Sequence, residues 1–195
     1  MTGFDFAYVG PPPPWDIGRP QPAFLRLAAQ GVIVGPVLDA GCGTGENALH
    51  LAGLGFEATG LDAAPTAIAA ARAKAAQRGL AVEFIVGDAF ALGQLGRTFA
   101  TIIDCGLFHV FGDADRATYM ASLAAAVDAG GRIHILCFSD RQPGSWGPRR
   151  VTEAELRAAF ADGWQVEAIQ PERFETNNDG PPVEAWLATF VRRLP

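Results

Sequence analysis

The stretch Val37-Leu-Asp-Ala-Gly-Cys-Gly-Thr-Gly-Glu-Asn47 decides the fold of this 195-residue chain. An apolar run ends at Asp39, glycines follow at three alternate positions, and the segment 46–54 is rich in helix formers. Glycine lets the backbone turn tightly and approach a ligand where a Cβ would collide with it. The stretch therefore predicts a buried strand, a glycine-rich turn, and a helix whose unpaired N–H groups face a ligand on the turn.

The chemistry of this turn favours a cationic ligand over a pyrophosphate. The pattern is Asp-x-Gly-x-Gly-x-Gly, whereas dinucleotide sites carry Gly-x-Gly-x-x-Gly. Asp39 would repel phosphate but could accept hydrogen bonds from a cationic amine, so we expect S-adenosylmethionine (SAM) as the ligand. Two alternatives stay open: a nicotinamide-dependent oxidoreductase, which the spacing disfavours, and a non-catalytic SAM-binding module.

Two further strands are each expected to end in an acid. The strand 56–61 leads into Asp62, about 20 residues past the glycines, where an acid can accept from both ribose hydroxyls. The strand 82–88 ends at Asp88, which could accept from an exocyclic amine, with Phe90 available against a ring face.

A fourth strand begins at Thr98 and ends at Asp104, followed by Cys105. Because ligands of open α/β sheets bind at the carboxyl ends of the strands, we expect all four acids to line one site. The alternative for each acid is that it caps the helix or turn that follows it.

The rest of the chain predicts one alternating α/β domain. Helices are expected at 22–30, 65–78, 113–127 and 152–160, a fifth strand at 130–137, and closing antiparallel strands at 164–174 and 183–192. Thr152-Glu-Ala-Glu155 is a capping box. The proline-rich residues 1–14 are expected to be extended or mobile until they meet the ligand. We expect a single domain over 1–195, with 1–30 as an N-terminal arm and cap helix and 31–195 as the catalytic core.

Composition supports a compact enzyme that acts on a small molecule. Hydrophobic residues make up 49% of the chain, and the formal net charge of −6 argues against a nucleic-acid partner. No apolar run is long enough to span a membrane and no signal sequence is evident, so a cytoplasmic monomer or homodimer without membrane contact is expected. Cys42, Cys105 and Cys137 lack metal-ligand spacing, and we expect no metal site.

These segments together resemble the class I SAM-dependent methyltransferases, over nearly the whole chain. Residues 37–45, Gly60-Leu-Asp62, Gly87-Asp88-Ala89 and 104–109 are similar to the successive motifs of that family, and 130–137 is similar to its fifth strand. The stretch Pro13-Pro-Trp15-Asp-Ile-Gly18-Arg-Pro20-Gln-Pro22 resembles the N-terminal signature of members that act on thiols, halides and heterocycles, including alkylquinolone methyltransferases.

The resemblance implies a Rossmann-like α/β fold: a seven-stranded, mostly parallel sheet with helices on both faces and an antiparallel C-terminal strand. It implies in-line methyl transfer to O, S or N of a small aromatic or heterocyclic acceptor, with a thiol or halide as the alternative. Trp15 would close over the methionine end of SAM, and Arg19 would pair with the cofactor carboxylate or with a surface acid. The expected cofactor-binding residues are Trp15, Arg19, Asp39, Gly41, Cys42, Gly43, Asn47, Asp62, Ala63, Asp88, Ala89, Phe90, Asp104 and Cys105.

An acceptor pocket and a base are the remaining expectations. His109 follows the fourth strand and is the candidate general base; the alternative is that it only orients its loop. Aromatic residues in loops or beside strand ends could line a pocket for a flat acceptor, although some could instead pack the arm onto the sheet. The expected acceptor-side residues are Phe6, Tyr8, Phe108, His109, Phe138 and Trp146, with Phe4 and Phe111 as further aromatics.

Overall fold

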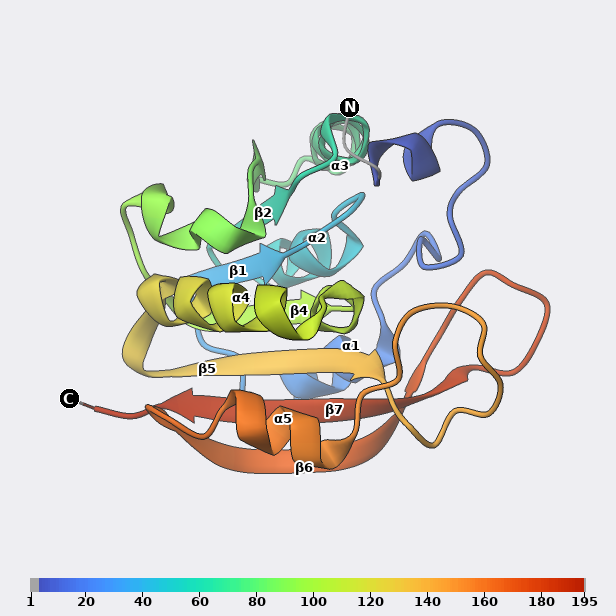
Figure 1. The fold of residues 1–195 in the computed structure, drawn as a ribbon. Helices are drawn as coiled ribbons and strands as arrows, with labels where there is room; N and C mark the ends of the chain where they lie inside the picture. Colours follow the sequence, from blue (N-terminus) through green and yellow to red (C-terminus); the bar gives the residue numbers. More distant parts are fainter. Residues whose placement is uncertain (1–3, 195) are drawn as a thin grey trace.

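One seven-stranded sheet organises the chain, whose residues 4–194 are described by a computed structural model. The strand order is β3-β2-β1-β4-β5-β7-β6, and the first five are mutually parallel (Figure 1). β7 pairs antiparallel with both β5 and β6, which confirms the expected Rossmann-like sheet. The strands are β1 (Val37–Ala40), β2 (Ala58–Asp62), β3 (Glu83–Val86), β4 (Phe99–Cys105), β5 (Val127–Phe138), β6 (Trp164–Phe174) and β7 (Val183–Arg192).

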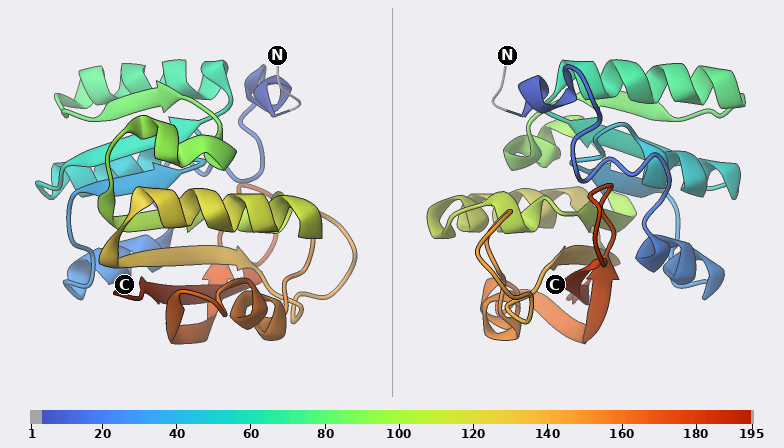
Figure 2. Two further views of the ribbon diagram at one scale, coloured as in Figure 1. Left: turned by 60° about the vertical axis from the view of Figure 1, so that its left-hand side comes forward. Right: turned by 90° about the vertical axis from the view of Figure 1, so that its right-hand side faces the viewer.

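Helices cover both faces of the sheet (Figures 1 and 2). They are α1 (Pro22–Ala29), α2 (Glu46–Gly53), α3 (Pro65–Arg78), α4 (Asp113–Ala126) and α5 (Glu153–Ala159), with short 3₁₀ turns η1 (Asp5–Tyr8), η2 (Ala89–Leu95) and η3 (Phe108–Val110). Within residues 4–194, none of these helices combines the length and apolar character needed to cross a membrane.

The central strands β1 and β4 are largely apolar because neighbouring residues enter different cores. Leu38 and Ile102 belong to the core that α4 and α5 cover, whereas Val37 and Ile103 pack with α1. Successive side chains of a strand point to opposite faces, so a sheet covered on both sides needs continuous apolar runs. The chain runs from β1 outward to β3 and returns at β4, so β1 and β4 flank the switch point where open α/β sheets bind ligands.

The local signals located most element boundaries. The α3, β6 and β7 segments have the predicted bounds, and α3 stops at Gly79, whose φ of +65° lies in the left-handed region. The capping box of α5 is present with Thr152 as the N-cap. β2 begins two residues later than predicted, because Phe56 belongs to the turn that closes α2.

The N-terminal arm corrects one expectation. Residues 1–3 lie outside the described chain, but residues 5–8 form η1 against α3 where extended or mobile chain was expected. Asp5 is buried, and its Oδ1 accepts a hydrogen bond from the Thr66 N–H at 2.9 Å. Ala64, the N-cap of α3, has no side chain able to cap the helix. Asp5 therefore supplies from 61 positions away the cap that the local sequence lacks.

Candidate cofactor and acceptor site

Asp39, at the end of β1, has one carboxylate oxygen satisfied and one free. Oδ2 accepts from the Ala48 N–H at 3.2 Å, whereas Oδ1 is buried without a partner among the residues described. Burial raises the pKa of this carboxyl from 3.8 to about 8. A buried acceptor that lacks a donor costs free energy, so this position suits a cationic hydrogen-bond donor supplied by a ligand.

Two positions of the loop after β1 require glycine for different physical reasons. A Cβ on Gly45 would lie 2.6 Å from the Phe84 ring, so this glycine allows α2 to approach β3. A Cβ on Gly43 would lie 2.9 Å from the Tyr8 hydroxyl, and its φ of +52° is left-handed. Gly43 thus lies directly beneath the N-terminal arm. Cys42 beside it is a buried thiol whose pKa burial raises.

Asp62 ties the end of β2 to the glycine loop. Its Oδ2 accepts from the Gly43 N–H and its Oδ1 from the Ala64 N–H, both at 2.8 Å. Burial raises the pKa of this carboxyl. Ala63 beside it is exposed. The carboxylate therefore lies at the mouth of the loop, where the sequence predicted a ribose acid.

The other two acids have partners within their own loops. Asp88 is exposed and caps η2, with Oδ1 accepting from the Phe90 N–H at 2.8 Å. Asp104 is fully buried and accepts from the Leu107 and Phe108 N–H groups and from the Tyr119 hydroxyl. For Asp104 the capping alternative is correct: its carboxylate organises the turn after β4 and has no free face for a cofactor.

The positions around these acids are packed as well. Phe90 lies against Phe111, with ring centroids 4.7 Å apart, and Ala89 packs on the same core. Asn47 on α2 accepts from the Gln21 N–H through Oδ1 at 3.1 Å. Burial raises the pKa of the Cys105 thiol.

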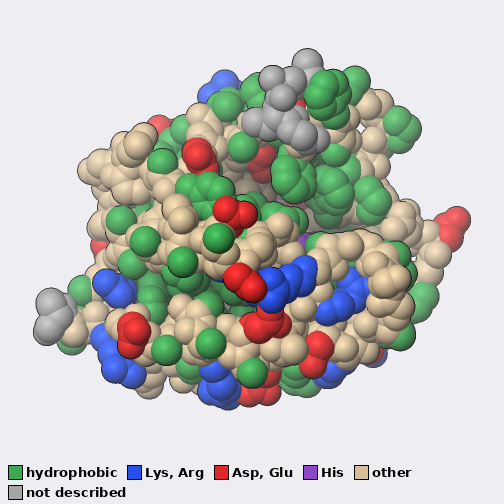
Figure 3. Space-filling model, viewed as in Figure 1, with side chains coloured by type: hydrophobic (Ala, Val, Ile, Leu, Met, Phe, Trp, Pro, Cys, Tyr) green, Lys and Arg blue, Asp and Glu red, His purple; other side chains and the backbone are tan. Residues whose placement is uncertain are grey.

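The arm covers the glycine loop through Tyr8, Trp15 and Asp16. The Trp15 indole N–H donates to the Tyr8 hydroxyl at 3.0 Å, and the Thr44 hydroxyl donates to Asp16 Oδ2 at 3.0 Å. The Trp15 ring lies edge-on to Phe4 and Tyr8 and is 42% exposed. Apolar side chains gather over the arm on the face shown in Figure 3, with Phe6 63% exposed.

Arg19 forms an ion pair with Glu175 at 2.5 Å, so the structure favours its surface-acid alternative over the cofactor carboxylate. Arg19 thereby joins the arm to the connection that follows β6.

His109 lies in an aromatic cluster at the carboxyl ends of β4, β5 and β6. Its ring centroid lies 4.9 Å from that of Phe138 and 6.0 Å from that of Phe174, and Trp146 packs edge-on to Phe138. The Phe138 N–H donates to His109 Nδ1 at 3.0 Å. The proton of the neutral ring must then be on Nε2. Burial, together with the charges of Arg150 and Arg116, lowers the pKa of His109 to about 3.

These contacts disfavour the base assignment of His109 and favour its alternative, that the ring orients its loop. A base needs a free lone pair and a pKa near the working pH, and this ring has Nδ1 occupied and a strongly lowered pKa. An acceptor-side role is also disfavoured for Phe108. Its ring is fully buried in the core under the Arg116 guanidinium, whose Cζ is 4.5 Å from the ring centroid.

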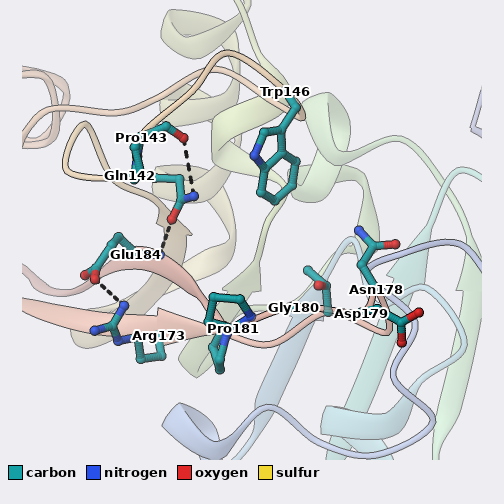
Figure 4. A pocket seen from close by; sticks show the side chains of 11 residues that line it. Gln142, Pro143, Trp146, Arg173, Asn178, Asp179, Gly180, Pro181 and Glu184 are labelled. Carbon is teal, nitrogen blue, oxygen red and sulfur yellow. Dashed lines mark hydrogen bonds and ion pairs between the residues drawn. The ribbon is translucent and has the colours of Figure 1, made fainter.

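A cavity of about 510 Å³ opens beside Trp146 (Figure 4). It lies between the loop after β5 and the β6–β7 connection. Gln142 Oε1 accepts from the Glu184 N–H at 2.8 Å, and Glu184 also pairs with Arg173. Within the described range, no group of three or more His, Cys, Asp or Glu side chains is arranged to hold a metal ion.

Sequence reasoning missed several residues of this region: Phe174, Gln21, Thr44, Asp16, Arg150 and Asn177. Asp16 and Gln21 lie inside the N-terminal signature, and Thr44 lies inside the glycine-rich stretch. Phe174 could have been anticipated from its place at the end of β6. The others depend on contacts between segments far apart in the chain.

Known proteins share this sequence and this geometry. The family described as "Methyltransferase domain" matches residues 37–131. The 2-heptyl-1-hydroxyquinolin-4(1H)-one methyltransferase of Mycobacteroides abscessus is 44% identical over 171 residues, which are 86% of this chain and 75% of that protein. A structure solved in work on the conversion of a disulfide bond into a thioacetal group during echinomycin biosynthesis is 42% identical, with a TM-score of 0.90 over 97% of this chain and 91% of that one.

A more distant structure shares the fold alone. Magnesium protoporphyrin IX methyltransferase from Synechocystis PCC 6803, with bound SAM, has a TM-score of 0.68 at 24% identity. The alignment covers 87% of this chain and 76% of that one.

Proposed function

This chain belongs to the class I SAM-dependent methyltransferases, and from that premise we propose that it methylates a heteroatom of a small aromatic or heterocyclic acceptor. The observation that carries the proposal is the aromatic cluster of His109, Phe138, Phe174 and Trp146. These rings come from strand ends and loops at the edge of the sheet where the glycine loop also lies. His109, Phe138 and Phe174 are buried, and Trp146, which is 49% exposed, is the ring of this cluster that offers a flat apolar surface to a flat acceptor.

The residues present fit the cofactor. SAM supplies an electrophilic methyl carbon on a sulfonium, and the remaining chemistry belongs to the protein. In this proposal the unpaired Oδ1 of Asp39 receives the cationic amine, and Gly41 and Gly43 admit the ligand to the loop. Asp62 takes the ribose hydroxyls, and Asp88 with Phe90 takes the adenine side.

The protein's part in the reaction is alignment and exclusion of water. Methyl transfer is an in-line displacement, so holding the nucleophile in position removes most of the entropic cost. His109 would act by presenting Nε2–H and holding the wall, because its Nδ1 already accepts from Phe138 and its pKa is lowered to about 3. The acceptor would therefore react as an anion, or would lose its proton to solvent.

Two relatives above 40% identity are described with different chemistry. The name of the Mycobacteroides protein specifies a hydroxylated quinolone, and the echinomycin work concerns sulfur. The aromatic cluster favours the hydroxylated heterocycle, and a thiol or halide is the alternative.

The test measures formation of S-adenosylhomocysteine (SAH) with a 1-hydroxyquinolin-4-one, a thiol and iodide as acceptors. We expect the largest kcat/KM with the heterocycle. Turnover of the thiol or iodide alone would replace the proposal with its alternative. Tight SAH binding without turnover of any acceptor would favour a non-catalytic SAM-binding module.

His109→Ala separates alignment from proton transfer. Because the ring is a wall and a donor, we expect kcat to fall by a similar factor, up to about 10²-fold, on a protonated and on an anionic acceptor. His50→Ala, in the last turn of α2, is the control and should leave both rates near wild type. A loss confined to the protonated acceptor, of roughly 10²–10⁴-fold, would restore the base role.

A further inference from the structure

The connection between β6 and β7 reaches across to the N-terminal arm (Figures 1 and 2). The Asn177 N–H donates to the Pro14 carbonyl at 2.9 Å. Its side-chain Nδ2 lies 2.9 Å from the Pro13 carbonyl, 3.1 Å from that of Asp16 and 3.3 Å from that of Pro12. One residue thus contacts four backbone carbonyls of the segment 12–16, more than 160 positions away.

The sequence of the arm explains why it needs such a donor. Residues 11–14 are four consecutive prolines, which carry carbonyl acceptors but no N–H donors. Such a segment cannot pair its carbonyls by forming a helix, so they are left to water or to a donor from another segment. The two N–H groups of an asparagine amide, aimed into the concave side of the turn, meet that need.

A second contact fixes the same connection to the start of α1. The buried Gln21 side chain donates through Nε2 to the Glu175 carbonyl at 2.8 Å and accepts from the Glu175 N–H through Oε1 at 3.0 Å. Since Glu175 is held to the core by this reciprocal pair, Asn177 two residues later is presented from a rigid base. Because Asn177 is held in place in this way, its hydrogen bonds fix the position of the arm relative to the core.

The arm that Asn177 holds covers the candidate cofactor site. Tyr8 lies over Gly43, and Asp16 accepts from Thr44 in the glycine loop. The same β6–β7 connection also lines the cavity beside Trp146 on the acceptor side. Asn177 thus joins the N-terminal arm, which covers the glycine loop, to the β6–β7 connection, which lines the cavity beside Trp146.

We propose that Asn177 is a positioning residue that holds the N-terminal arm closed on the glycine loop. It touches neither reacting group and acts through Tyr8, Trp15 and Asp16. This assignment rests on the proposed function only for its effect on methyl transfer. Closure of the arm is a property of the ligand-free protein.

Asn177→Asp tests the latch, since the change keeps the shape of the side chain and replaces its donor with acceptors that face carbonyls. Chymotrypsin cleaves after aromatic residues, and the arm carries Phe4, Phe6, Tyr8 and Trp15. We expect roughly ten-fold faster cleavage of the arm, which corresponds to about 1.4 kcal/mol of lost hydrogen bonding. Mass spectrometry of the released fragment gives the rate, and SAH affinity by calorimetry should weaken by a similar factor.

The controls separate the latch from a general loss of structure. Asn177→Gln keeps the donor and should restore both values toward wild type. Gln170→Glu makes the same change of charge on the exposed face of β6 and should leave arm cleavage unchanged. Global unfolding by guanidinium should be nearly the same in all variants.

Wild-type rates of arm cleavage and wild-type SAH affinity in Asn177→Asp would overturn the proposal. Cleavage without ligand is independent of catalysis. An arm that opens in Asn177→Asp, in a protein that methylates none of the acceptors, would therefore support the latch while the proposed function fails.

Discussion

At the scale of single residues, the buried acids of this site differ in how many hydrogen-bond donors their carboxylates have. Asp104 is as buried as Asp39, yet it accepts from two N–H groups and a tyrosine hydroxyl, and burial raises its pKa only to about 6. Asp39 has a single backbone partner and a pKa raised to about 8. Of these two buried carboxylates, Asp39 has fewer donors and is therefore the one that can accept hydrogen bonds from a cationic ligand.

Asp39 should make the ligand-free protein less stable as pH rises. Its folded pKa exceeds its ordinary value of 3.8, so the native state binds more protons between pH 3.8 and about 8, and the free energy of unfolding falls across that window. One such group contributes a slope approaching about 1.4 kcal/mol per pH unit. Asn at this position is neutral at every pH, so Asp39→Asn should flatten the decline. Guanidinium unfolding of both proteins across this range measures the slopes, and equal slopes would contradict the raised pKa.

At the scale of elements, the ends of helices follow local sequence signals, whereas the packing of one element against another does not. The stop of α3 at Gly79 and the capping box of α5 are written in consecutive residues, so their positions could be predicted. The 3₁₀ turn η1 could not be predicted, because Asp5 is stabilised by the Thr66 N–H at the far start of α3.

The capping box of α5 should matter for stability alone. Thr152 Oγ1 accepts from the Glu155 N–H at 3.1 Å, and Glu155 Oε2 accepts from the Thr152 N–H at 2.7 Å. Thr152→Ala should lower the free energy of unfolding by about 1 kcal/mol with little change in kcat/KM. Thr152→Ser keeps the hydroxyl and is the matched control. A large loss of activity at unchanged stability would show that α5 has a role in the site.

At the scale of the whole molecule, topology assembles the site from distant segments. The reversal of strand order between β1 and β4 opens a crevice at their carboxyl ends, and the loops after β1, β2, β4 and β5 converge there. The arm and the β6–β7 connection then close over that edge from opposite ends of the sequence. Ligand binding should consequently stabilise the entire fold.

SAH and NAD should affect thermal stability differently. A ligand at about 100 times its Kd stabilises the native state by about 2.7 kcal/mol, which for a chain of this size corresponds to a rise in Tm of about 5–10 °C. We expect that rise with SAH and none with NAD at the same concentration, because the loop carries Asp39 where a pyrophosphate would need donors. A comparable shift with NAD would contradict the cofactor assignment of the loop.

The sequence by itself determined the sheet, its strand ends and the cofactor class. These follow from local patterns: apolar runs, glycines at alternate positions and an acid near the end of each of the first four strands. Only the tertiary structure decided how each acid is used, since Asp39 and Asp104 look alike in sequence and differ in their donors. It also decided that His109 is held by the Phe138 N–H, and that Asn177 binds the arm. The physical reason is that hydrogen-bond partners and burial arise between segments far apart in the chain, where no local pattern records them.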